Sequence, residues 1–243
     1  MAKLDPKDLL AAGGHFGHKT SRWHPKMAPY IYGTRDNTHI IDLIKTVDMI
    51  DEATAFIEKT VASGKHVMLV GTKKQAQAVV RDAAQGTSMP YVVERWLGGM
   101  LTNYETMQGR IKYLKKLEKQ LENGELDARY NKLEVQRFEE EIAKLNLNFG
   151  GIKDMAGMPG ALFITDVVED QNAVKEAIRL GIPVVGVCDT NANPDGIDYI
   201  IPANDDAIKA LKLITDQIVK AIEAGKAKQK QAPAEEKTEK GGK

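Results

Sequence analysis

HVMLVG, residues 66–71, is followed directly by TKKQAQAVVRDAAQ, residues 72–85. The first segment is short, apolar and rich in β-forming residues, and it ends in glycine, which predicts a buried strand. The second segment has the composition of a helix. A buried strand that leads at once into a helix is the repeating unit of a parallel sheet, so this stretch predicts an α/β fold.

The same alternation continues along the chain. Further buried strands are predicted at residues 91–96, 161–166, 182–190 and 198–203, and helices at residues 170–180 and 206–224. Leu180-Gly181 forms a C-cap for the first of these helices, and Asn204 or Asp205 forms an N-cap for the second. The chain therefore predicts a Rossmann-like (flavodoxin-like) parallel five-stranded sheet flanked by helices, with right-handed crossovers.

The alternation stops between residues 103 and 149, where two apolar series flank a turn at Asn123-Gly124. They consist of Met107, Ile111, Leu114, Leu117 and Leu121, and of Val135, Phe138, Ile142, Leu145 and Phe149. Two apolar residues per heptad make the narrow seam of a coiled coil. We therefore predict an inserted antiparallel α-helical coiled-coil hairpin, with two ordinary core helices as the alternative.

These patterns divide the chain into three parts. Residues 1–102 and 150–224 form a Rossmann-like domain with an N-terminal arm, and residues 103–149 form the inserted hairpin. Residues 225–243 carry no large apolar side chain, which predicts a disordered tail. Paired glycines, Gly98-Gly99 and Gly150-Gly151, bracket the hairpin and predict hinges.

Composition excludes several classes of protein. No apolar run approaches the roughly 18 residues that a membrane span needs, and MAKLDPKDLL lacks the apolar core of a signal peptide. Cys188 is the single cysteine, so an intrachain disulfide and a thiolate metal cluster are excluded. These features predict a cytoplasmic protein without a membrane partner.

The net charge is zero, from 34 basic and 34 acidic residues, but the charges are not evenly spread. Residues 1–35 carry an excess of four positive charges and residues 103–119 an excess of three. Charges act over about 8 Å in cell-like salt, so a neutral total is compatible with a basic face. In residues 13–43, here called the arm, aromatic side chains alternate with cations, which is typical of RNA contact. The alternative is an irregular arm packed on the sheet, with Phe16, Trp23 and Tyr30 in the core.

Enzyme chemistry finds little support in the motifs. The chain has no G-x-G-x-x-G, no G-x-x-x-x-G-K-[ST] and no G-x-S-x-G. Gly71-Thr72-Lys73-Lys74 follows a strand and begins a helix, so it can hold one anion at the helix N-terminus. His18 can reach the strand ends, where several aspartates cap turns or hold zinc or magnesium. A Rossmann-like nucleotide-binding or metal-dependent enzyme is the alternative function.

Five long motifs, in order, resemble one known family. They are GGHFGHKTSRWHPKMAPYIYGTRDNTHIIDL (13–43), LVGTKKQA (69–76), RWLGGMLTN (95–103), GGIKDMAGMPGALFITD (150–166) and GIPVVGVCDTNANPDGIDYIIPANDDA (181–207). Each is similar to bacterial ribosomal protein S2, and the resemblance runs from about Leu9 to Ile222.

The resemblance implies a structural protein of the small ribosomal subunit, with no enzymatic activity, no required cofactor and no small-molecule substrate. It implies binding to small-subunit rRNA at the head/body junction on the solvent side, late in assembly. It also implies contacts with neighbouring proteins, including docking of ribosomal protein S1. Some family members hold a metal, which here directs attention to zinc or magnesium at His18, Asp189 and Asp205.

Candidate RNA contacts come from the arm, the helix start after the first strand, the hairpin base and the first hairpin helix. They are Lys19, Arg22, Trp23, Lys26, Arg35, Lys73, Lys74, Arg95, Trp96, Asn103, Arg110, Lys112, Lys115 and Lys116. The alternative for each lysine is a solvated surface charge. No catalytic residues are predicted.

Overall fold

The computed structural model describes residues 4–239 and contains the predicted parallel sheet. Its strands are β4 (Val67–Val70), β5 (Tyr91–Val92), β6 (Ala161–Ile164), β7 (Val184–Cys188) and β8 (Tyr199–Pro202). They lie in the order β5-β4-β6-β7-β8, and every neighbouring pair is parallel. This is the flavodoxin-like strand order, whose topological switch point lies between β4 and β6. The five-stranded α/β prediction is confirmed, although each strand is shorter than its predicted range.

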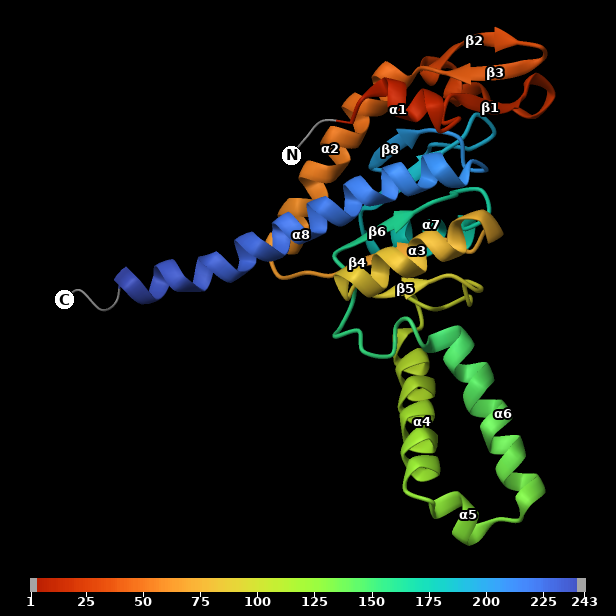
Figure 1. The fold of residues 1–243 in the computed structure, drawn as a ribbon, viewed down its shortest axis with the longest axis vertical. Helices are drawn as coiled ribbons and strands as arrows, with labels where there is room; N and C mark the ends of the chain where they lie inside the picture. The colour runs from red at the N-terminus through yellow and green to blue at the C-terminus, as the bar shows by residue number, and fades with distance from the viewer. Residues whose placement is uncertain (1–3, 240–243) are drawn as a thin grey trace.

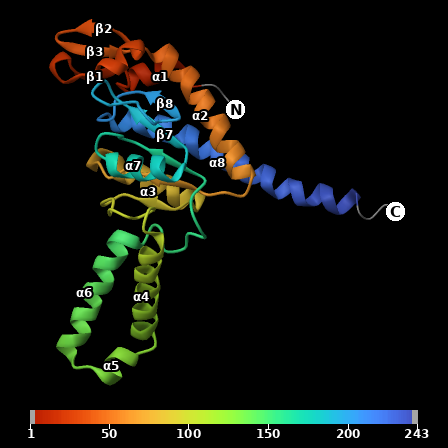
Figure 2. The ribbon, with the colours of Figure 1, turned by 180° about the vertical axis from the view of Figure 1, so that it is seen from behind.

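Alternating residues of β4 explain the two sides of the core. Val67 and Leu69 belong to one buried cluster with side chains of α2 (Leu43–Ala62), α3 (Lys74–Thr87) and α8 (Ile208–Glu239). Met68 and Val70 belong to a second cluster with α7 (Gln171–Leu180) and the base of the inserted helices. Because successive side chains of a strand point to opposite faces, an uninterrupted apolar run fills both layers. Figures 1 and 2 show the sheet between these helix layers.

The arm is more regular than the sequence predicts. After α1 (Pro6–Ala11) come β1 (Phe16–Lys19), two 3-10 turns (Thr20–Arg22 and Pro25–Tyr30), β2 (Ile31–Arg35) and β3 (Thr38–Ile41). The three strands form an antiparallel sheet in the order β1-β3-β2. Met27 is fully buried and attaches the arm to the domain, whereas Phe16 and Trp23 are exposed. Placing Phe16 and Trp23 in the core is therefore wrong; Tyr30 does pack against buried residues.

The insertion contains α4 (Tyr104–Glu122), α5 (Glu125–Arg129) and α6 (Lys132–Phe149). Figure 1 shows α4 leading away from the domain and α6 returning beside it. Ile111, Leu114 and Leu117 of α4 are buried, as the apolar series predicts. The connection is the short helix α5 rather than a simple turn, because Gly124 takes a left-handed φ of +69° and restarts the helix. The coiled-coil character of the pair stays a prediction.

The glycine pairs that flank the insertion serve packing. Gly99 has a φ of +88°, which only glycine adopts readily. A Cβ on Gly151 would lie 2.2 Å from the carbonyl oxygen of Tyr91, whose N–H donates to Gly151 O at 3.0 Å. This bond covers the outer edge of β5, so the chain returns from the insertion through a close backbone contact.

α8 runs to Glu239, past residue 224 where the predicted helix ends, and the predicted disorder of residues 225–243 stays a prediction. Lys228 forms an ion pair with Glu58 of α2 at 2.5 Å, and Lys226 donates to the carbonyl of Thr87. Alanine, lysine and glutamine favour helix, and the apolar turns before Gly225 have already fixed the helix on the domain. Residues 240–243 lie outside the described residues. Among the residues described, no helix is long and apolar enough to cross a membrane.

Candidate functional site

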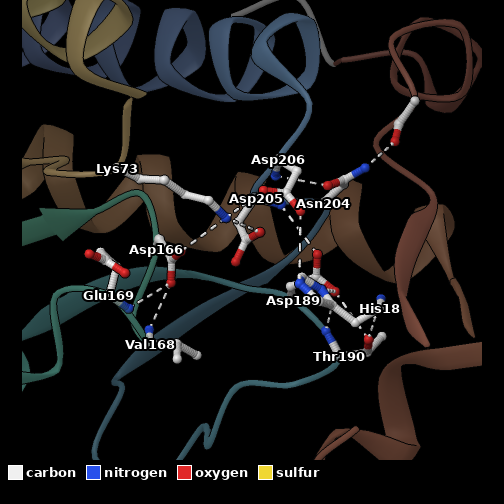
Figure 3. A network of polar contacts seen from close by, with 11 residues as sticks. His18, Lys73, Asp166, Val168, Glu169, Asp189, Thr190, Asn204, Asp205 and Asp206 are labelled. Carbon is white, nitrogen blue, oxygen red and sulfur yellow. Dashed lines mark hydrogen bonds and ion pairs between the residues drawn. The ribbon is translucent and has the colours of Figure 1, made fainter. Parts of the chain in front are cut away.

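The loops that follow β4, β6, β7 and β8 meet at one edge of the sheet. They bring together five polar side chains, and His18 of the arm lies beside them. These six residues are here called the rim cluster (Figure 3): His18, Lys73, Asp166, Asp189, Asp205 and Asp206. The sequence predicts this meeting, because parallel strands end on the same side.

Lys73 lies among three carboxylates of the rim cluster. Its Nζ is 2.7 Å from Asp205 Oδ1, 2.7 Å from Asp206 Oδ1 and 3.2 Å from Asp166 Oδ2. Burial acts to lower the pKa of Lys73, but the hydrogen bonds to Asp205 and Asp206 outweigh it and raise that pKa. The lysine is therefore a fixed cation that joins three loops. RNA contact by Lys73 stays a prediction, to which this geometry gives no support because the charge faces the protein.

The anion position at the start of α3 is also filled from within the chain. The N–H and the hydroxyl of Thr72 donate to the carboxylate of Asp170 at 3.2 and 2.8 Å. Asp170 is buried, which raises its pKa to about 6. In a nucleotide-binding relative of this fold, a phosphate would approach this switch point. Here a side-chain carboxylate and Lys73 occupy it, which disfavours the nucleotide-binding alternative.

His18 joins the arm to the rim cluster. Its Nδ1 lies 3.1 Å from Asp189 Oδ1, and its backbone N–H donates to Thr190 Oγ1 at 2.8 Å. The hydrogen bond that the imidazole of His18 donates to Asp189 is the main cause of a raised pKa for His18. Burial and neighbouring carboxylates raise the pKa of Asp205 to about 7.

The predicted metal ligands do lie close together. One ligand atom from each of His18, Asp189 and Asp205 falls within 4.8 Å of the others. However, Lys73 already contacts Asp205, and the N–H and hydroxyl of Thr190 donate to Asp189. Internal donors thus already contact Asp189 Oδ1 and Asp205 Oδ1, and zinc or magnesium at this position stays a prediction.

A second polar arrangement fixes the hairpin base, residues 96–102. Glu176 of α7 accepts hydrogen bonds from the indole of Trp96 (3.0 Å) and from the backbone N–H groups of Gly99 (2.8 Å), Leu101 (3.0 Å) and Thr102 (3.0 Å). Burial would raise the pKa of Glu176, but these donors lower it. Nothing in the sequence pairs Glu176 with residues some 75 positions away, so this contact was not predicted.

Trp96 has a structural role in this arrangement. Its side chain is buried, and its indole N–H donates to Glu176. A ring in this position supports the hairpin base. RNA contact by Trp96 stays a prediction, to which the burial of the ring gives no support.

The remaining candidates divide into paired and unpaired side chains. Lys26 pairs with Asp195, Lys115 with Asp154, and Arg35 weakly with its neighbour Asp36. Trp23 is partly exposed and lies over His39, with ring centroids 5.1 Å apart. Asn103 precedes α4 and accepts a hydrogen bond from Thr106. The other seven candidates are exposed and form no ion pair with another described residue: Lys19, Arg22, Lys74, Arg95, Arg110, Lys112 and Lys116.

Most of these cations lie in two regions. Lys19 and Arg22 belong to the arm, and Arg110, Lys112 and Lys116 belong to α4, whereas Lys74 begins α3 and Arg95 follows β5. Figures 1 and 2 show the arm and the inserted helices at opposite ends of the molecule. The geometry therefore supports an extended surface for a large polyanion and gives no catalytic constellation.

Comparison with known proteins agrees with a non-enzymatic scaffold of this kind. A family model described as ribosomal protein S2 matches residues 9–225. The protein is therefore of the ribosomal class. The chain belongs to the ribosomal protein S2 family. Proteins of this family are structural, so the prediction that the chain is not an enzyme is confirmed, and the family needs no cofactor.

Curated relatives cover most of the chain. The small ribosomal subunit protein uS2 of Psychrobacter cryohalolentis is 50% identical over 224 residues, which are 92% of this chain and 84% of the relative. The protein of the same name in Psychrobacter arcticus matches equally. That of Syntrophobacter fumaroxidans is 49% identical over 226 residues, 93% of this chain and 82% of the relative.

Proposed function

We propose that this chain is a structural constituent of the small ribosomal subunit in the cytoplasm, where it binds small-subunit rRNA and neighbouring ribosomal proteins. The family and the names of the relatives support the assignment to the subunit. The observation that carries RNA binding is the set of exposed cations on the arm and α4 that have no ion-pair partner among the described residues.

These side chains suit phosphates better than bases. Lysine and arginine at exposed positions neutralise backbone charge and fix the orientation of a protein, whereas reading of sequence needs contacts to base edges. We therefore propose Lys19, Arg22, Arg35, Lys74, Arg95, Arg110, Lys112 and Lys116 as phosphate contacts. Trp23 and Asn103 are exposed and complete the proposed surface.

The finer placement is also part of the proposal. We place the protein at the head/body junction on the solvent side, added late in assembly, with ribosomal protein S1 docked on it. An extended molecule with one charged region at each end suits a bridge between two parts of a particle (Figure 1).

Sedimentation of a cell lysate through sucrose tests the proposal, with the chain located by mass spectrometry in low and in high salt. The expected result is comigration with small subunits in low salt and release in high salt, because affinity falls with a log–log slope of roughly 0.7–0.9 per neutralised phosphate. A chain that stays at the top of the gradient in low salt would refute the proposal.

Charge variants give a quantitative control. Replacing Lys112 and Lys116 by glutamine should lower the salt slope of binding to depleted subunits by roughly 1.4–1.8, for two lost phosphate contacts. Replacing Lys212 and Lys220, exposed on α8, should leave the slope unchanged. Equal effects of the two pairs would show that the charge on α4 has no special role.

A further inference from the structure

The side of the domain that carries α7 has a groove with one apolar wall and one polar wall. The apolar wall contains Val168, Val174 and Ile178, and the polar wall contains Asn191 and Asp195 of the loop after β7. The volume of the groove is about 300 Å³. Val168 is 40% exposed and Ile178 is 50% exposed, so the apolar wall is only partly covered by the chain itself. Large apolar side chains left open beside a cavity are typical of a contact surface.

The loop that forms the polar wall is fixed from two sides. Within the loop, the N–H of Asp195 donates to Asn193 Oδ1 at 3.1 Å. From the arm, the N–H of His24 donates to the carbonyl of Thr190 at 2.7 Å, and Lys26 pairs with Asp195. A groove between a helix and a fixed loop loses little conformational freedom when it is filled.

Asn191 gives the groove an unused hydrogen-bond acceptor. Its Oδ1 is shielded from solvent and has no hydrogen-bond partner in the described part of the chain. A shielded acceptor without a donor costs free energy, and this cost is recovered when a donor arrives. Because Asn191 lines the groove, a molecule bound there can bring an N–H group within reach of this side chain.

The charges of the groove do not favour RNA. Lys175 and Asp195 are the lysine and the carboxylate of the lining, so their charges cancel. Lys175 also donates to Gln171 Oε1 at 3.0 Å, and Asp195 pairs with Lys26. A phosphate therefore meets no excess of positive charge here, whereas an apolar side chain can cover the apolar wall.

We propose that this groove docks a neighbouring protein of the small subunit, which inserts one aliphatic or aromatic side chain against Ile178 and donates an N–H to Asn191. The proposal rests on the proposed place in the small subunit and adds the site at which one neighbour is held. Interface energy concentrates where a single side chain fills a pocket, and a backbone amide or an arginine beside that side chain supplies the donor.

The experiment measures binding of the full-length protein to small subunits from which it has been stripped with salt, and to protein-free small-subunit rRNA. Ile178→Asn removes the apolar side chain without a change of charge. It should weaken binding to the stripped subunits by about 5- to 30-fold and leave binding to the rRNA unchanged. Ile44→Asn, the same change at an exposed isoleucine of α2, should bind both like the wild type.

Asn191→Ala tests the acceptor. It should weaken binding to the stripped subunits by about 2- to 12-fold, the loss of one hydrogen bond. Because Asn191 Oδ1 has no partner within the described chain, the variant should unfold at the same or a higher denaturant concentration than the wild type. A lower unfolding midpoint together with wild-type binding would overturn this contact.

A crosslink identifies the occupant. Cys188 is the only cysteine and is buried, so Lys175→Cys directs a thiol-reactive photocrosslinker to the groove. In reassembled subunits the crosslink should join one ribosomal protein, and Ile178→Asn should abolish it. A crosslink to rRNA or to a second copy of this chain would overturn the proposal.

Failure of the groove differs from failure of the function on which it rests. If the wild type binds the stripped subunits and both Ile178→Asn and Asn191→Ala bind equally well, the groove is overturned and the place in the subunit stands. If the wild type itself does not bind, the place in the subunit fails as well. If Ile178→Asn weakens binding to protein-free rRNA to the same extent, the occupant is RNA and the proposal is also overturned.

Discussion

Glu176 and Trp96 are held together by a hydrogen bond of 3.0 Å between the carboxylate and the indole N–H. The same carboxylate accepts three backbone N–H groups of the hairpin base. One side chain of α7 therefore holds the segment from which α4 leaves the domain. This polar contact acts together with the apolar side chains of the inserted helices, which belong to the same buried cluster as Trp96.

Truncation of Glu176 should loosen the hairpin base. Glu176→Ala leaves the N–H groups of Gly99, Leu101 and Thr102 without their acceptor and should cost about 1.5–3 kcal/mol of unfolding free energy, as for hydrogen bonds to a charged group. Hydrogen exchange of these three amides should accelerate. Glu169→Ala, which removes another carboxylate at an exposed position, serves as the control. Unchanged exchange in Glu176→Ala would contradict the role of this contact.

Lys73 should be essential for stability rather than for RNA affinity. Lys73→Met leaves Asp166 and Asp205 buried without their cation, which should cost about 3–5 kcal/mol of unfolding free energy. The double variant Lys73→Met/Asp205→Asn should recover part of the loss, because it also removes a charge. Chemical denaturation measures both. A Lys73→Met protein that is as stable as the wild type but binds subunits weakly would restore the phosphate role.

Asp170 should make stability depend on pH in mildly acidic solution. Its pKa is about 6 in the fold against an ordinary 3.8, so between these values the folded state binds more protons than the unfolded state. Its contribution to the unfolding free energy therefore falls as pH rises from about 4 to 6, by up to about 1.4 kcal/mol per pH unit. Asp170→Asn removes this slope. Parallel curves for the two proteins over that window would argue against a raised pKa.

Gly151 should tolerate no side chain, in contrast to Gly98 on the other side of the insertion. Gly151→Ala places a Cβ 2.2 Å from Tyr91 O and should cost about 3 kcal/mol, the upper range for overpacking. A Cβ on Gly98 would meet nothing within 4 Å, so Gly98→Ala should be close to neutral. Comparison of the two unfolding free energies checks the claim, and equal costs would count against the edge contact.

Chelation should leave the fold intact. One oxygen of Asp189 and one of Asp205 already have internal donors, so dialysis against EDTA should not change the melting temperature. A ligand that binds the folded state alone raises stability with its concentration. A melting temperature that falls in EDTA and recovers with zinc or magnesium would instead establish the predicted ion.

Local patterns predicted the sheet, because the apolar runs of β4, β6 and β7 can only be buried. They also predicted the helices of the insertion from the spacing of Ile111, Leu114 and Leu117. The rim cluster followed in outline, since the ends of parallel strands meet. Contacts between distant residues were not predictable: Lys226 and Lys228 of α8 contact Thr87 and Glu58, which no composition reveals.

The candidate site was only partly predictable for the same reason. Sequence indicates that Lys73 and Trp96 carry chemistry suited to RNA, but not that Asp205 and Glu176 bind them first. Conversely, Tyr32 stands in the arm motif, yet only the folded chain shows that it is 81% exposed. Residue type determines which contacts a side chain can make, and the fold determines which side chains remain available to a partner.

The separation between the arm and the inserted helices has a consequence for residence on a large particle (Figure 2). When one end is bound, the other end is confined near its own site at a high effective concentration, so the whole binds more tightly than either end. Each end alone can then be weak and quickly reversible. Such a molecule is able to correct its alignment one end at a time, and it leaves only when both ends release together.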